Sequence, residues 1–379
     1  MAERVRSSRW LPYLFLVAVV AVVAGLLYFQ NAQKSGGLVL GAALPLTGQY
    51  AQYGIVPRNA IDLAIAQRAT GYPYSVSVQY EDTQLKPDLA LNAIHKLIDI
   101  HRVPVVFGAA GSNETQVVGP IAQKSGVVLI SPSSTAASLS SIGSYFFRTI
   151  PTDTYEATYM ARFVHARGVR RIGIFAVNDT GTKSLADSFK DEFVHLGGTV
   201  VVYVLAPKDA NDLRTQITAL RSAAPQAIYL VGYATETGVF LKQQAELSLG
   251  LPLYSAHPAD APEVETIAGS AANGLIYSTT GASGNPEVRA RFVDAYRKRY
   301  GQPPGEFAPE AYDAAMLVLD AIQKVGTDPT AIRDYLHSVH DYDGASGRIT
   351  FSASGDVEKP IQLKVIRDEK PESYGVTAR

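Results

Sequence analysis

The sequence predicts an α/β protein of two doubly wound, Rossmann-like lobes with parallel central sheets, preceded by an N-terminal apolar helix. Three observations lead to this prediction. The chain has 379 residues, more than a single hydrophobic core usually serves. Short apolar strands alternate with helical stretches, which is typical of parallel sheets covered by helices on both faces. The alternation starts again after residues 146–149, so it divides into two consecutive units.

The N-terminus contains a candidate membrane segment. Arg4, Arg6 and Arg9 precede an apolar run over residues 11–29, which as a helix is roughly 28 Å long, close to the hydrocarbon thickness of a bilayer. Basic residues before such a run place the rest of the chain outside the cytoplasm. Both a cleaved signal peptide and an uncleaved signal anchor fit, and the length of the run favours the anchor. We expect a periplasmic protein in which residues 1–37 form a signal anchor or a signal peptide with a tether. As an anchor, 11–29 would lie in the cytoplasmic membrane.

The first unit follows from apolar runs that alternate with helical spacing. Strands are expected over 38–44, 76–80, 103–107 and 127–130, and helices over 55–68, 85–100 and 115–124. Pro57 is compatible with a helix because proline is tolerated in a first turn.

The second unit repeats this pattern. Its strands are expected over 171–177, 199–205, 227–231 and near Leu253, and its helices over 155–167, 182–196, 212–223 and 235–249. Two further helices, 286–300 and 309–325, and two strand-like segments, 348–351 and 361–366, complete the chain.

Composition and motifs exclude several function classes. The formal net charge of −1 gives no basic field to attract nucleic acid. The absence of cysteine excludes disulfides, thiolate nucleophiles and Cys-ligated metals. There is no G-x-S-x-G, H-E-x-x-H or P-loop motif. His337 and His340 would need a third metal ligand, and the nearby Asp341 and Asp343 fit a solvated turn better than a metal site. We therefore expect no enzyme, no cofactor and no metal.

Three loops that follow predicted strands are rich in small hydroxyl residues. They span residues 46–54, 108–115 and 131–135. Ligands of open parallel sheets bind at the carboxyl ends of the strands, and hydroxyls with free backbone N–H groups suit a carboxylate or a similar acceptor-rich group. The same residues also cap helices where no ligand exists, so the pattern alone leaves binding and capping open.

Short motifs occur along the chain in a specific order and spacing. They are P-L-T-G at 45–48 with Gly54, E-D-T at 81–83, the loop at 107–115, I-S-P at 130–132, F-R-T-I-P-T-D at 147–153, Y-G at 300–301, A-Y-D-A-A at 311–315 and F-S-A-S-G-D at 351–356. Together they resemble the branched-chain amino-acid binding family of type I periplasmic binding proteins, over nearly everything from Leu38 onward.

The resemblance implies a three-crossing hinge that lets two lobes close on a ligand. Lobe I would comprise residues 38–152 and 280–343, and lobe II residues 153–279 and 344–379. The implied function is that of an extracytoplasmic solute-binding protein of an ABC importer. It would bind a small carboxylate-bearing or amide-type solute, such as an amino acid, and present it as a monomer to permease subunits in the membrane. An anchor at 11–29 would also suit a membrane-anchored, ligand-sensing receptor on the same fold.

The resemblance also assigns ligand-binding residues. Ser112 matches the serine that holds a ligand carboxylate. Ser134 and Thr135 match the next loop of the family, where a backbone group and a threonine hydroxyl share carboxylate and ammonium. An aromatic from each lobe would cover the ligand. An acid at 153 would meet an ammonium, although it would serve equally as a helix N-cap. With the histidine discussed next, the candidates are Tyr53, Ser112, Ser134, Thr135, Asp153, Tyr233 and His257.

Two departures from the family pattern concern specificity. Thr180 stands where the family often has a tyrosine, and His257 stands where amino-acid binders often have a glutamate, with Asp260 three residues further on. A buried ammonium without an acid is costly, so the departure at 257 counts against an α-amino acid. His257 would instead meet an acceptor, as in an amide, an aromatic acid or another small carboxylate.

Overall fold

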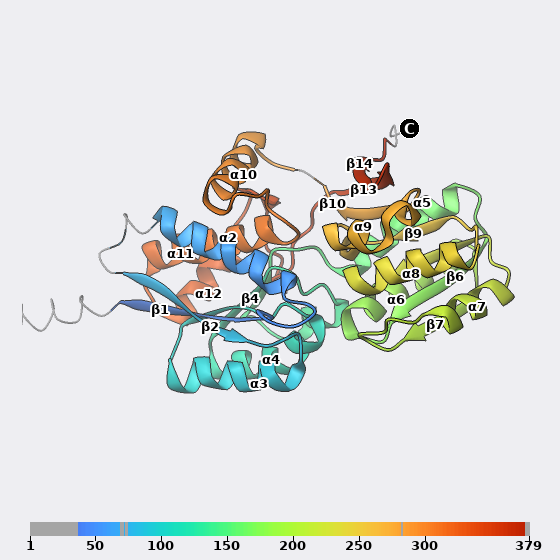
Figure 1. Ribbon diagram of the computed structural model, residues 1–379. Helices are drawn as coiled ribbons and strands as arrows, with labels where there is room; N and C mark the ends of the chain where they lie inside the picture. The colour runs from blue at the N-terminus through green and yellow to red at the C-terminus, as the bar shows by residue number, and fades with distance from the viewer. Residues whose placement is uncertain (1–36, 69–71, 73–74, 282, 376–379) are drawn as a thin grey trace, which may run out of the picture.

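The computed structural model describes residues 37–68, 72, 75–281 and 283–375, which form two α/β lobes side by side (Figure 1). The apolar helix predicted over 11–29 lies outside the described residues. Within the described part of the chain, no helix combines the length and the apolar character needed to cross a membrane.

The first lobe is built on a five-stranded parallel sheet in the order β2-β1-β3-β4-β5. Successive strand residues point to opposite faces, so Val105 and Phe107 join one buried cluster and Val106 another. Helices α2, α11 and α12 cover one face, α3 and α4 the other, and α10 packs beside α2 (Figure 1). The bounds are β1 Leu38–Leu44, β2 Val76–Asp82, β3 Val105–Gly108, β4 Val128–Ser131, β5 Phe146–Arg148, α2 Gln52–Arg68, α3 Pro87–His95, α4 Ser112–Ser125, α10 Pro286–Tyr300, α11 Ala308–Val325 and α12 Pro329–His337.

The second lobe contains a seven-stranded sheet in the order β14-β13-β10-β9-β8-β6-β7. It is parallel from β7 to β10, whereas β13 and β14 add an antiparallel edge that the sequence did not predict. Helices α5 and α6 lie on one face and α7, α8 and α9 on the other. The bounds are β6 Arg171–Val177, β7 Thr199–Ala206, β8 Ala227–Val231, β9 Leu253–Ser255, β10 Ile276–Thr280, β13 Ile361–Arg367, β14 Lys370–Ser373, α5 Asp153–Ala166, α6 Thr180–His195, α7 Arg214–Ser222, α8 Ala234–Glu246 and α9 Pro262–Ala268. The predicted α/β class with parallel sheets is confirmed.

The chain passes between the lobes after β5, after β10 and after a short hairpin of β11 (Tyr342–Gly344) and β12 (Gly347–Ile349). The hairpin turn is attached to the first lobe, since the backbone N–H groups of Ala345 and Ser346 each donate to Asp313 of α11 at 2.7 Å. Arg148 of β5 likewise donates to Asp356 at 2.6 Å. The predicted lobe boundary at 343/344 falls within this hairpin, and Ala345, Ser346 and Asp356 bond to residues of the first lobe.

Two helix boundaries also differ from the sequence prediction. Helix α4 begins at Ser112 instead of residue 115, because its first turn is stabilised by a bond from the Gly111 N–H to the Glu114 carboxylate at 2.8 Å. The long helix expected over 85–100 is α3 followed by one π-helical turn over Lys96–Ile100. The first difference matters for function, because it places Ser112 in the first turn of a helix.

Candidate functional site

A small cavity lies between the lobes at the carboxyl ends of the parallel strands. Its volume is about 40 Å³, several times what one ordered water needs. The loops after β3 and β4 and the start of α2 line it from the first lobe, and the starts of α6 and α8 and the segment after β9 line it from the second. Five of the seven predicted site residues are among its lining: Tyr53, Ser112, Thr135, Tyr233 and His257.

Ser112 is oriented to donate a hydrogen bond. Its hydroxyl oxygen accepts from the backbone N–H groups of Thr135 at 3.2 Å and Ala136 at 3.1 Å, which leaves the O–H free to donate. Helix α6 of the other lobe starts nearby: a Cβ on Gly181 would lie 3.3 Å from this oxygen, so glycine permits the close approach. Two helix N-termini and a donating hydroxyl therefore meet here, which suits an anion.

Ser134 lies behind the cavity wall and is not part of the lining. Its hydroxyl is 2.6 Å from that of Thr115 and donates to the carbonyl oxygen of Ala109 at 2.9 Å. Both contacts are buried, so Ser134 fixes the shape of the two hydroxyl-rich loops.

Asp153 is fully buried in the first turn of α5 and also lies outside the lining. Burial raises its pKa to about 6, although His257 and the hydroxyls of Ser184 and Thr135 act in the opposite direction. The interpretation of Asp153 as the N-cap is wrong, because Thr152 takes that position and accepts from the Tyr155 N–H.

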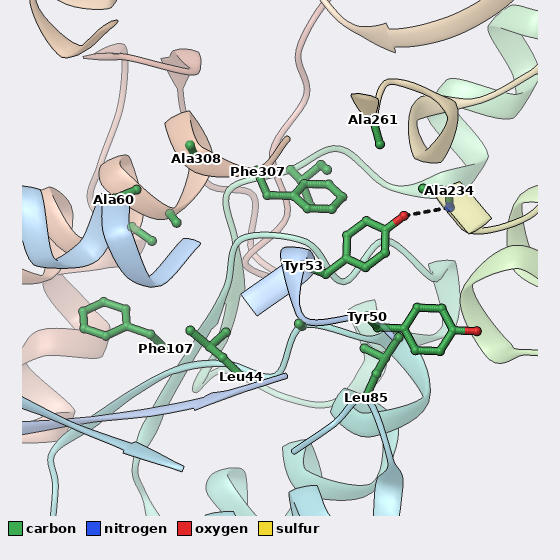
Figure 2. Packing of buried hydrophobic residues seen from close by; sticks show 14 of the residues in the cluster. Leu44, Tyr50, Tyr53, Ala60, Leu85, Phe107, Ala234, Ala261, Phe307 and Ala308 are labelled. Carbon is green, nitrogen blue, oxygen red and sulfur yellow. Dashed lines mark hydrogen bonds between the residues drawn. The ribbon is translucent and has the colours of Figure 1, made fainter. Parts of the chain in front are cut away.

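Tyr53 and Tyr233 face each other from the two lobes, with their ring centroids 5.7 Å apart. The Tyr53 hydroxyl accepts from the Ala234 N–H at 2.9 Å (Figure 2), and so caps helix α8 from across the cleft. Tyr233 donates its hydroxyl to Asp179 at 2.8 Å. The Tyr53 hydroxyl accepts a bond and the Tyr233 hydroxyl donates one, and both residues line the cavity.

His257 is held by a buried carboxylate that the sequence did not identify. Its Nδ1 lies 2.6 Å from Glu156, which also accepts from the His257 backbone N–H at 2.9 Å and from the Ser278 hydroxyl at 2.7 Å. Burial alone would lower the pKa of His257, but the charge and hydrogen bond of Glu156 raise it to about 9. At neutral pH the cavity is therefore bordered by an imidazolium cation.

Phe307 is a further cavity residue that sequence reasoning missed. Its ring centroid lies 6.1 Å from that of Tyr53 and 5.9 Å from that of His257 (Figure 2). Its backbone φ of 63° is uncommon for a bulky residue, and such outliers concentrate at functional sites. In the sequence, an isolated aromatic residue before a helix does not indicate a ligand site.

Asp260, the acid three residues after His257, is paired within the second lobe. It lies 2.6 Å from Lys364 and accepts from Tyr277 at 2.7 Å. It lines a second cavity of about 450 Å³, which adjoins the first because His257 and Phe307 line both.

Comparisons with known proteins agree with this architecture. Residues 38–366 match the periplasmic binding protein family. A leucine-, isoleucine-, valine-, threonine- and alanine-binding protein of Pseudomonas aeruginosa is 27% identical over 350 residues, which cover 90% of this chain and 92% of that protein. The Leu/Ile/Val-binding protein of Escherichia coli K12 is 24% identical over 346 residues, covering 89% and 93%.

Solved structures are similar over the same region. A leucine binding protein from Thermotoga maritima has a TM-score of 0.84 and 27% identity, covering 89% of this chain and 98% of that one. An ABC transporter solute-binding protein from R. palustris, in complex with benzoate, shares the fold with a TM-score of 0.82 at 21% identity, covering 90% and 96%. Because the family model matches most of this chain, the chain belongs to the periplasmic binding proteins, and it is related to the Leu/Ile/Val-binding proteins.

Proposed function

We propose that this protein is the periplasmic solute-binding component of an ABC importer. It binds a small carboxylate-bearing or amide-type solute, such as an amino acid or an analogue, between its lobes and presents it as a monomer to permease subunits. The observation that carries this proposal is the interlobe cavity, where a donating serine, an imidazolium and aromatic rings from both lobes meet. The printed names of relatives that bind leucine, isoleucine and valine support the same solute class.

The orientation of the solute follows from the polarity of the cavity walls. The carboxylate would meet the Ser112 hydroxyl, the loop at Thr135 and the N-termini of α4 and α6, because these groups all donate hydrogen bonds. The apolar part of the solute would lie against the rings of Tyr53, Tyr233 and Phe307.

The contacts of the cavity serines favour binding over nucleophilic catalysis. Ser112 is engaged by backbone N–H groups, and the Ser133 hydroxyl donates to the carbonyl oxygen of Ala110 at 2.9 Å. A serine nucleophile needs a base to accept its proton, whereas the contacts of the Ser112 hydroxyl in the described part of the chain are with two backbone N–H donors.

The test is calorimetric titration of the full chain with L-leucine, L-alanine, L-phenylalanine, benzoate and acetamide. We expect one-to-one binding of at least one probe, and Ser112→Ala to raise its Kd by about tenfold or more, because a hydrogen bond to a charged group contributes about 1.5–3 kcal/mol. Ser222→Ala removes an exposed hydroxyl on α7 and is the matched control. If no probe binds, the proposed function is contradicted. If wild type and Ser112→Ala bind a probe with equal affinity, the assignment of the site is contradicted.

A further inference from the structure

Two acids with buried, unpartnered oxygens adjoin residues that line the cavity: Asp153 is bonded through its N–H to Thr135, and Glu306 precedes Phe307. Among the described residues, both carboxyl oxygens of Asp153 and both of Glu306 are buried without a partner at hydrogen-bonding geometry. Leaving a buried polar group unpaired is costly, so such groups call for an explanation. The carboxyl oxygens of both residues could be satisfied by hydrogen-bond donors.

Of the two acids, Glu306 has fewer neighbouring groups that offset the cost of burying its charge. Asp153 has the hydroxyls of Ser184 and Thr135 acting on it. For Glu306, burial raises the pKa well above its ordinary range and the neighbouring carboxylates of Asp260, Glu310 and Glu156 raise it further, while the His257 imidazolium lowers it. The charged form of Glu306 is therefore disfavoured unless a donor reaches its carboxyl oxygens.

Glu306 lies beside the ligand cavity, next to residues that line it. The next residue, Phe307, lines that cavity, and Glu306 itself lines the adjoining one together with Phe307 and His257. Its carboxylate also acts electrostatically on Tyr53 and His257, both of which line the ligand cavity. A solute seated against these side chains would therefore be close to the unpaired carboxyl group.

We infer that Glu306 is a specificity-determining residue, whose carboxyl group accepts hydrogen bonds from an N–H-rich cationic group, such as a primary ammonium, on the bound solute. The inference rests on the proposed function, since it concerns the end of the solute opposite the carboxylate at Ser112. The second lobe has His257 where an acid was expected, and its Asp260 is paired with Lys364. The first lobe supplies the missing acid instead.

The test compares solutes that differ only in the amine. Full-length wild type, Glu306→Gln and Glu306→Ala are titrated with L-leucine and 4-methylpentanoate, L-phenylalanine and 3-phenylpropanoate, and L-alanine and propanoate. We expect wild type to bind at least one amino acid about tenfold or more tightly than its amine-free partner, and both variants to lose that preference while binding the amine-free acid within about threefold of wild type. Glu287→Gln, at a side chain 79% exposed on α10, is the matched control; unchanged melting temperatures show that the variants fold.

The outcomes separate the inference from the proposed function. If wild type binds carboxylates without regard to the amine, or if the Glu306 variants weaken both members of a pair equally, the role of Glu306 is overturned and the solute-binding function stands. If none of the six probes nor benzoate binds wild type, the proposed function fails and the inference fails with it.

Discussion

At the scale of the residue, the pair of His257 and Glu156 makes stability depend on pH. A histidine in an unfolded chain has a pKa of about 6.5, and here it is raised to about 9. The folded state therefore binds the proton more tightly, so this contribution is fully present below about pH 6.5 and is lost as the pH rises through the folded pKa.

We expect Glu156→Gln to remove this contribution. The free energy of unfolding of wild type should exceed that of the variant by roughly 3 kcal/mol near pH 6, and the difference should narrow towards pH 9. Urea unfolding at the two pH values measures it, and titrations of other groups largely cancel because both proteins share them. A difference that is the same at pH 6 and pH 9 would show that the imidazolium is not the stabilised form.

At the scale of the element, a buried cluster ties helix α11 to the third passage between the lobes. Asp313 accepts from the turn of the β11–β12 hairpin and from the Ser346 hydroxyl, which in turn accepts from Lys359 at 2.5 Å. Burial lowers the pKa of Lys359 and raises that of Asp313 to about 6, although Lys359 opposes the second shift. Each charge is tolerated because the other is present.

The cluster predicts strongly non-additive substitutions. Asp313→Asn or Lys359→Met alone should cost about 3–5 kcal/mol, since each leaves one buried charge without its partner. The double variant should cost clearly less than the sum of the two. A double-mutant cycle by urea unfolding measures this, and additive costs would mean that the two charges are not coupled through Ser346.

Local periodicity explains which elements the sequence predicted. Strands β1, β6 and β8 coincide with their predicted ranges because each is a continuous apolar run with punctuation at its ends. Strands β5, β11 and β14 have three or four residues each and were not predicted. These strands form because they pair with other strands. Three or four residues are too few to show a hydrophobic periodicity in the sequence.

The site residues also divide into those that follow a local sequence pattern and those that tertiary packing brings together. The hydroxyl-rich loops could be found because they directly follow strands, and parallel strands end at one edge of a sheet. Glu156 could not, because its partner His257 is 101 positions away in the chain. Phe307 and Glu306 come from a segment after α10 that only the packing of α11 brings into the cleft.

At the scale of the whole molecule, the lobes are joined across the cleft by direct hydrogen bonds. Tyr50 donates to Glu236 of α8 at 2.6 Å, and the Tyr53 hydroxyl caps the same helix. Lys208 of the second lobe donates to the carbonyl oxygen of Leu85 in the first at 3.0 Å. These bonds involve no ligand, so they favour this arrangement of the lobes whether or not a solute is bound.

Tyr50→Phe should therefore shift the empty protein towards an open form. The substitution removes one bond to a carboxylate, worth about 1.5–3 kcal/mol, while Glu236 keeps its bond from the Asp209 N–H at 2.9 Å and is not left unpaired. The apparent Kd for a solute is the intrinsic Kd divided by the closed fraction, so it should rise as that fraction falls. Small-angle scattering should show a larger radius of gyration without solute and recovery at saturation.

A matched control separates this effect from the loss of any tyrosine hydroxyl. Tyr80→Phe also removes a bond to a carboxylate, that of Asp62 at 2.7 Å, but both residues lie in the first lobe. It should lower stability without changing the radius of gyration or the affinity. If the two variants behave alike in scattering and in titration, the interlobe bonds do not set the closed fraction, and closure must depend on the solute alone.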